Sequence, residues 1–169
     1  MKTLVIGLGN PLLSDDGVGW EIVRQVQRIL PSRAAGRSIP SQDVIEYEFL
    51  GLGGLSLMEH LIGYDRAILV DAIHTGSVPC GKVSYLTVED LEDAAYGHLS
   101  SAHDVTFGQA MQIGARLGAD LPHRIDIVAV EAQHVYDFSE LLSPPVAAAV
   151  PEAVQQVLWL IENGMEDDK

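Results

Sequence analysis

Basic residues and cysteine are scarce in this sequence of 169 residues. Lysine and arginine together number 10, against 24 aspartates and glutamates, so the formal net charge is −14. This charge argues against a nucleic-acid partner, because affinity for nucleic acid comes mainly from neutralised phosphates, and against an anionic membrane surface. The single cysteine, Cys80, excludes an internal disulfide and fits a reducing compartment.

Long hydrophobic runs are also missing. The first apolar stretch, Leu4–Leu8, is too short for the core of a signal peptide, and no window approaches the ~20 residues that a membrane-spanning helix needs. We therefore expect a cytoplasmic protein with no membrane insertion. A chain of this length with 47% hydrophobic residues suits one globular domain, 1–169, in which we expect residues 162–169 to fray.

Strand-like and helix-like segments alternate along the chain. Short apolar runs predict the strands, and apolar residues at near-3.6 spacing predict the helices. The predicted order is strand 3–7, helix 17–30 ended by Pro31, strand 43–50, helix 55–62, strand 65–73, strand 83–88 with an antiparallel edge as one option, helix 103–117, strand 124–130 and helix 144–161. This order predicts an α/β fold with a mostly parallel sheet of about five strands, covered by helices on both faces.

Polar side chains gather where the predicted strands end. In open α/β sheets, ligands bind at the loops that leave the carboxyl ends of the strands. Asp15 and Asp16 follow the first strand, Asp71 lies near the end of the central strand, and His103 precedes a helix. Two carboxylates and one imidazole from three loops can hold nickel, zinc, iron, manganese or cadmium, and three protein ligands leave coordination positions open.

The acids also have structural alternatives. A carboxylate at the start of a helix can cap its free N–H groups, and we expect Asp15 to do so, with Ser14 as the other option. One cap suffices, so the second carboxylate, Asp16, is the functional candidate. Asp71 can instead accept hydrogen bonds from loop N–H groups, since a buried acid needs partners.

The choice of histidine is open on spacing alone. Asp104 can cap the helix after it and leave His103 as a surface residue. His74 and His98 are further candidates, and nothing in their spacing ranks them against His103.

Several familiar signatures are absent. The chain has no H-E-x-x-H, C-x-x-C or G-x-S-x-G, which argues against common zinc proteases and serine hydrolases. Gly7-x-Gly9 begins a dinucleotide fingerprint, but the third glycine is replaced by Leu12, so a nucleotide-binding domain is a weaker alternative. Cys80 has no base beside it in the sequence, and we interpret it as an inert thiol.

One long motif carries a family resemblance. The segment G7-L-G-N-P-L-L-S-D-D-G-V-G19 resembles the signature of the nickel–iron hydrogenase maturation endopeptidases, and later segments resemble the family's other motifs in the same order: L69-V-D-A-I73, S101-A-H-D104 and L142-S-P-P-V146. The resemblance implies a three-layer α/β/α sandwich around a twisted sheet. It also implies an endopeptidase that removes the C-terminal extension of a nickel-loaded hydrogenase large-subunit precursor.

The resemblance assigns residues as well. Asp16, Asp71 and His103 match the family's two metal-contacting acids and its histidine, although many relatives carry Glu at the position of Asp16. It implies no cofactor of the protein's own, because the nickel comes with the substrate, and cadmium or zinc can substitute in vitro. The metal would then test whether the precursor is ready, since a nickel-free precursor lacks the charge that the carboxylates bind. The alternative is a non-catalytic, nickel-sensing or chaperone-like protein that binds the same precursor.

Overall fold

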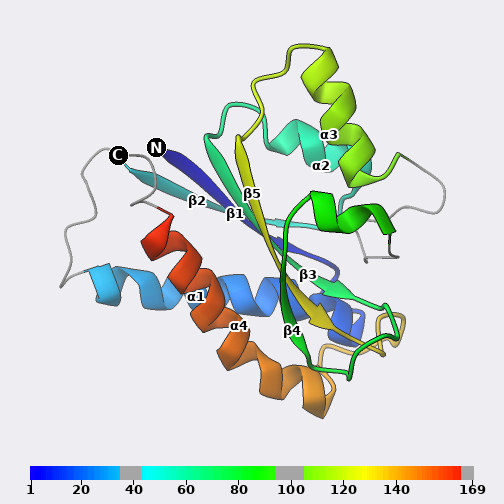
Figure 1. The fold of residues 1–169 in the computed structure, drawn as a ribbon. Coiled ribbons are helices and arrows are strands. Elements are labelled where there is room, and N and C mark those ends of the chain that lie inside the picture. The colour runs from blue at the N-terminus through cyan, green and yellow to red at the C-terminus, as the bar shows by residue number, and fades with distance from the viewer. Residues whose placement is uncertain (35–42, 94–104, 165–169) are drawn as a thin grey trace.

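A five-stranded sheet organises the chain (Figure 1). The computed structural model describes residues 1–34, 43–93 and 105–164. In order, the elements are β1 (Lys2–Leu8), η1 (Ser14–Gly17), α1 (Val18–Ala34), β2 (Val44–Leu50), α2 (Gly54–His60), β3 (Arg66–Ile73), β4 (Val83–Leu86), η2 (Glu89–Asp93), α3 (Phe107–Arg116), β5 (Arg124–Glu131) and α4 (Pro144–Asn163), where η marks a short 3-10 helix.

The sheet has the strand order β2-β1-β3-β5-β4. Four strands run parallel, and β4 pairs antiparallel with β5, with Val83 opposite Val130. The predicted α/β class and the antiparallel edge are both confirmed. The carboxyl ends of β1 and β3 therefore lie next to each other at one edge of the sheet.

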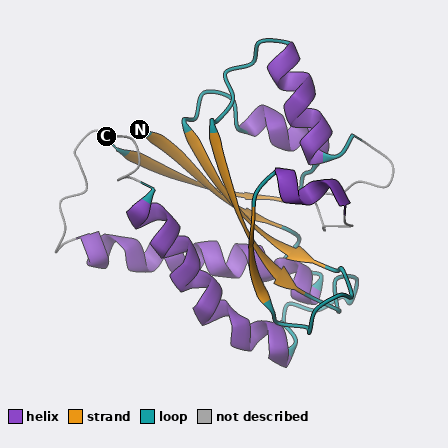
Figure 2. Ribbon diagram, viewed as in Figure 1, coloured by secondary structure: helices purple, strands orange, loops and turns teal. Residues whose placement is uncertain are grey.

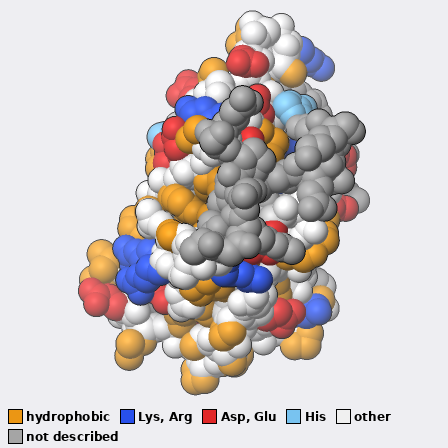
Figure 3. Space-filling view, turned by 90° about the vertical axis from the view of Figure 1, so that its left-hand side faces the viewer, with side chains coloured by type: hydrophobic (Ala, Val, Ile, Leu, Met, Phe, Trp, Pro, Cys, Tyr) orange, Lys and Arg blue, Asp and Glu red, His pale blue; other side chains and the backbone are white. Residues whose placement is uncertain are grey.

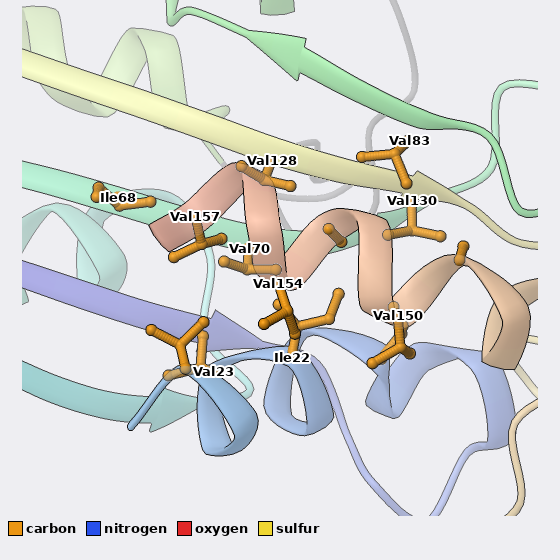
Figure 4. Close-up of a cluster of buried hydrophobic side chains, with 14 of the residues drawn as sticks. Ile22, Val23, Ile68, Val70, Val83, Val128, Val130, Val150, Val154 and Val157 are labelled. Carbon is orange, nitrogen blue, oxygen red and sulfur yellow. The ribbon is translucent and has the colours of Figure 1, made fainter. Parts of the chain in front are cut away.

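Helices cover both faces of the sheet, which confirms the three-layer arrangement (Figures 1 and 2). Ile68 and Val70 of β3 pack with α1 and α4, whereas Ala67 and Leu69 pack with α2 and α3. Figure 4 shows the first cluster, in which side chains of α1 and α4 meet those of the sheet. Burying each such aliphatic side chain stabilises the fold by about 1.5–3 kcal/mol. Because side chains alternate along a strand, Asp71 belongs to the α2–α3 face.

Helix α1 passes through the residue that was predicted to end it. Pro31 lies inside α1 and the helix continues to Ala34. A proline in a helix loses one main-chain hydrogen bond, but here its ring is exposed and only the last turn follows it. Arg33 in that turn contacts Gln155 Oε1 at 3.1 Å and Glu162 Oε1 at 3.2 Å, both on α4. These contacts hold the turn that the proline weakens.

Helix α3 begins later than predicted. Residues 103 and 104 lie outside the described part of the chain, and 105 and 106 are not helical. Thr106 caps the helix: its Oγ1 accepts from Gln109 N at 3.3 Å, and Gln109 Oε1 accepts from Thr106 N at 3.1 Å. The cap is thus Thr106 and not Asp104, and T-x-x-Q was its local signal.

The surface mixes charge and apolar side chains. On the face drawn in Figure 3, acidic, basic and hydrophobic side chains are interspersed. Among the described helices, none combines the length and hydrophobicity needed to cross a membrane.

Candidate active site

The turn after β1 holds Asp16 in one position. Gly9 has φ +118°, and a Cβ there would lie 1.8 Å from the carbonyl oxygen of Asp16, so only glycine fits. The Asp16 carboxylate is 7% exposed, and its Oδ2 accepts a hydrogen bond from Asn10 N at 2.7 Å. The chain therefore folds back on itself and fixes this carboxylate at the carboxyl end of β1.

Asn10 shapes the same turn. Its Oδ1 accepts from Leu12 N at 3.0 Å, and its carbonyl oxygen accepts from Leu13 N at 3.0 Å. The N–H of Asp16 in turn donates to the carbonyl of Leu13 at 3.1 Å. An asparagine that bonds the main chain two residues ahead is typical of tight turns, so the local sequence itself favours this geometry.

Asp71 reaches the same edge from β3. It follows Val70, which pairs with Gly7 of β1, and it is fully buried. A Cβ on Gly19 would lie 2.4 Å from the carbonyl oxygens of both Leu8 and Val70, so this glycine lets the first turn of α1 sit directly on the two strand ends. The segment that carries Asp16 is thereby packed against the strand that carries Asp71.

The predicted histidine cannot be placed. His103 lies outside the described residues, as does His98. The described chain resumes at Val105, whose carbonyl oxygen lies close to Gly54 at the start of α2, 2.5 Å from where a Cβ would be. Within residues 1–34, 43–93 and 105–164, no three side chains of His, Cys, Asp or Glu are grouped to hold a metal ion. The set of three metal ligands therefore stays a prediction.

A buried glutamate fixes the loop after β3. Glu131, at the end of β5, is 2% exposed and accepts three hydrogen bonds from Thr75 and Gly76 at 2.8–2.9 Å. His74 Nδ1 lies 2.7 Å from the carbonyl oxygen of Ala132. Since a carbonyl only accepts, Nδ1 carries the proton, and in the neutral ring Nε2 is the acceptor.

Asp15 has a different role from the predicted helix cap. No side chain caps η1. Asp15 is fully buried, and its Oδ1 accepts from Ser143 N at 2.7 Å, while its Oδ2 accepts from Ser143 Oγ at 2.9 Å and His134 N at 3.2 Å. The cap prediction is wrong because both oxygens are already engaged by the segment between β5 and α4. Asp15 thus fastens that segment to the turn that carries Asp16.

Ser14 forms a second attachment to the same segment. Its N–H donates to the carbonyl of Ser139 at 2.7 Å, and its Oγ donates to the carbonyl of Leu141 at 2.8 Å. The φ of Ser14 is +49°, a conformation that costs a non-glycine residue about 1–3 kcal/mol. The two hydrogen bonds offset this cost. No local sequence pattern predicts these partners, apart from a serine at each end of one contact, Ser14 and Ser139.

One pair of pKa shifts lies away from the strand ends. Tyr64 OH donates to Glu46 Oε2 at 2.5 Å. This hydrogen bond raises the pKa of Tyr64 to about 12 and, together with Lys2, lowers the pKa of Glu46. The contact joins β2 to the turn that follows α2.

Comparisons with known proteins agree with this fold. A family model described as hydrogenase maturation protease matches residues 40–159. The hydrogenase 2 maturation protease of Escherichia coli strain K12 is 27% identical over 98% of this chain and 94% of its own length. The solved structure of the hydrogenase-maturating endopeptidase HybD from E. coli superimposes with a TM-score of 0.70 at 26% identity, covering 97% of this chain and 94% of that one. The [NiFe] hydrogenase maturation protease HybD from Thermococcus kodakarensis gives a TM-score of 0.60 at 25% identity, covering 95% and 99%. The resemblance predicted from the sequence motifs is confirmed: the chain belongs to the hydrogenase maturation protease family, a family of endopeptidases.

Proposed function

We propose that this protein removes the C-terminal extension of a nickel-loaded hydrogenase large-subunit precursor in the cytoplasm. The observation that carries the proposal is the burial of Asp16 and Asp71 at neighbouring strand ends, 7% and 0% exposed. Burying carboxylates is costly, because each loses hydration and because like charges brought to one edge repel. A divalent cation brought by the substrate would relieve both costs.

Each residue has a defined part in this proposal. Asp16, oriented by the N–H of Asn10, and Asp71, held on the rigid strand β3, are the two acidic ligands. His103 is the third ligand, and its segment precedes α3, which packs on the sheet face to which Asp71 belongs. Three ligands from the enzyme leave positions for the precursor's own nickel ligands. Nickel thus belongs to the substrate, and only a loaded precursor is bound well enough to be cut.

Mass spectrometry of the precursor tests the activity. The large-subunit precursor from the same organism is incubated with this protein, with and without nickel. Loss of a C-terminal peptide from the nickel-loaded form alone is the expected result. A stable complex without cleavage would overturn the proposal in favour of a non-catalytic binding protein. Equal cleavage of both forms would overturn the claim that the enzyme acts only on a precursor that carries nickel.

Matched variants test the residues. Removing one partner of a buried ion pair costs about 3 kcal/mol or more, which is roughly a hundredfold in kcat/KM. We expect Asp16→Asn and Asp71→Asn to lose at least this much, and Asp120→Asn, an exposed residue in the turn between α3 and β5, to lose nothing. His103→Gln should lose activity, and His74→Gln should keep it. Retained processing by Asp16→Asn or His103→Gln, with folding confirmed by circular dichroism, would refute the assignment.

A further inference from the structure

Three large apolar side chains stand out into solvent on one loop. The loop runs from Ala132 to Ser143 between β5 and α4, and on it Tyr136 is 88% exposed, Phe138 85% and Leu141 78%. We call these three side chains the apolar ridge. Large exposed apolar side chains grouped in one place mark sites of interaction with other proteins.

The main chain under the ridge is held in place. The carboxylate of Asp15 binds the N–H groups of His134 and Ser143 near its two ends, and Ser14 binds the carbonyls of Ser139 and Leu141 between them. Figure 1 shows this loop beside the connection from β1 to α1. A ridge fixed before binding loses little conformational entropy when a partner covers it.

A cleft of about 500 Å³ adjoins the ridge. Ser14, Gly17 and Glu21 line one side, and Glu140 and Leu141 line the other. Ser14 and Gly17 are the first and last residues of η1, the 3-10 helix that also carries Asp16. A peptide that lies in this cleft therefore contacts the short helix that carries the carboxylate proposed to contact the substrate's metal.

The cleft combines apolar walls with acidic groups. Glu21 and Glu140 supply two carboxylates, and Arg24 is the one basic residue among the described residues that line it. The Arg24 guanidinium lies over the rings of Trp20 and Phe49, 5.3 and 5.6 Å from their centroids, which engages it in cation–π contacts. The chemistry that complements this cleft is a cationic side chain next to apolar ones.

We propose that the apolar ridge and its cleft bind the C-terminal segment of the hydrogenase precursor, the segment that spans the bond to be cut. The segment would contribute apolar side chains to the ridge and a cationic residue to Glu140. This inference rests on the proposed function and adds to it the surface that selects the substrate. A second copy of this chain is the competing occupant.

Paired variants and two forms of the substrate test the ridge. The ridge variants are Leu141→Ser and the double change Tyr136→Ser with Phe138→Ser. The control is Leu117→Ser at the end of α3, which removes a leucine that is 81% exposed away from this loop. Dissociation constants are measured by biolayer interferometry for the full-length nickel-loaded precursor and for the same subunit without its extension.

The expected result is specific to the extended form. Ridge variants should bind the full-length precursor about tenfold more weakly or worse, as is typical for aromatic anchors, with KM raised and kcat kept. Their affinity for the shortened subunit should be unchanged, and Leu117→Ser should match the wild type throughout. Glu140→Lys should also weaken binding of the full-length form alone.

The outcomes separate this inference from the proposed function. If the wild type cleaves the precursor and the ridge variants bind the full-length form as tightly as the wild type does, the apolar ridge is not the binding surface. The proposed function would then still stand. Equal weakening for both forms of the subunit would also overturn the apolar ridge as the binding surface, as would a wild-type dimer in ultracentrifugation that the ridge variants abolish. A wild type that neither binds nor cleaves any loaded precursor would overturn both. Hydrogen exchange on the wild type needs no variant: amides 135–142 should slow with the full-length precursor and not with the shortened one.

Discussion

Replacing Asp15 by Asn tests how the loop after β5 is held. The two carboxylate oxygens accept three hydrogen bonds in a fully buried position, from Ser143 N, Ser143 Oγ and His134 N. Asparagine has nearly the same shape but only one acceptor oxygen. Whichever way its amide is turned, the NH₂ group faces a main-chain N–H of Ser143 or His134, and that N–H loses its acceptor.

The cost follows from this count. A buried N–H without an acceptor costs about 1–3 kcal/mol, and the surviving hydrogen bonds lose their charge assistance, about 1 kcal/mol each. Because asparagine is neutral, the variant avoids the cost of burying a charge, which offsets part of this destabilisation. We expect Asp15→Asn to lower the free energy of unfolding by about 2–4 kcal/mol, well above the ~1 kcal/mol typical of a lost helix cap.

Urea unfolding followed by circular dichroism measures this loss. With a slope of about 2 kcal/mol/M, the midpoint should fall by roughly 1–2 M. The matched control is Asp137→Asn in the same loop, where the side chain is 64% exposed and contacts His134 Nδ1 at 2.6 Å. An exposed pair of this kind contributes about 0–1 kcal/mol. Equal midpoints for the two variants would show that the three hydrogen bonds to Asp15 do not hold the loop.

Three further predictions concern the frame around the site. Gly9→Ala should destabilise the protein by about 2 kcal/mol or more and reduce processing. The reason is that its Cβ would lie 1.8 Å from the carbonyl oxygen of Asp16 and that its φ is +118°. Thermal unfolding measures the loss of stability. Arg66→Met should cost about 3–5 kcal/mol in urea unfolding, because it leaves Asp126 buried without the ion pair at 2.5 Å. Glu46→Gln should return the pKa of Tyr64 from about 12 toward its ordinary ~10 in a spectrophotometric titration. Since the folded-state pKa is the higher one, the contribution of this hydrogen bond to stability is complete below pH ~10 and is lost as the pH rises toward 12.

The Gly9→Ala and Arg66→Met predictions each have a control variant within the chain. Gly118 also has a positive φ, +75°, but open space around it, so Gly118→Ala should cost less than Gly9→Ala. Arg124 contacts the same acid as Arg66 from a 37% exposed position, so Arg124→Met should cost less than Arg66→Met. Equal costs within either pair, or an unmoved tyrosine titration, would contradict the corresponding argument.

The elements of the fold follow from local sequence. The apolar run of β3 is buried along its whole length, and the apolar stripe of α1 faces the sheet. Such periodicities act over a few residues, so they predict strand and helix without knowledge of the rest of the chain. The same holds for the cap of α3, whose T-x-x-Q signal is local. The end of α1 was mispredicted at Pro31 because contacts with α4, from the far end of the chain, hold its last turn.

The three acids around the site divide in the same way. The sequence by itself placed Asp16 and Asp71 at strand ends, because loops leaving parallel strands share one edge of a sheet. Only the tertiary structure decided what Asp15 does. Its partners, His134 and Ser143, lie 119 and 128 residues away in the sequence, so no local pattern can predict them. A buried carboxylate takes whatever donors the folded chain brings to it, and here the sheet brings the loop after β5 against the turn after β1.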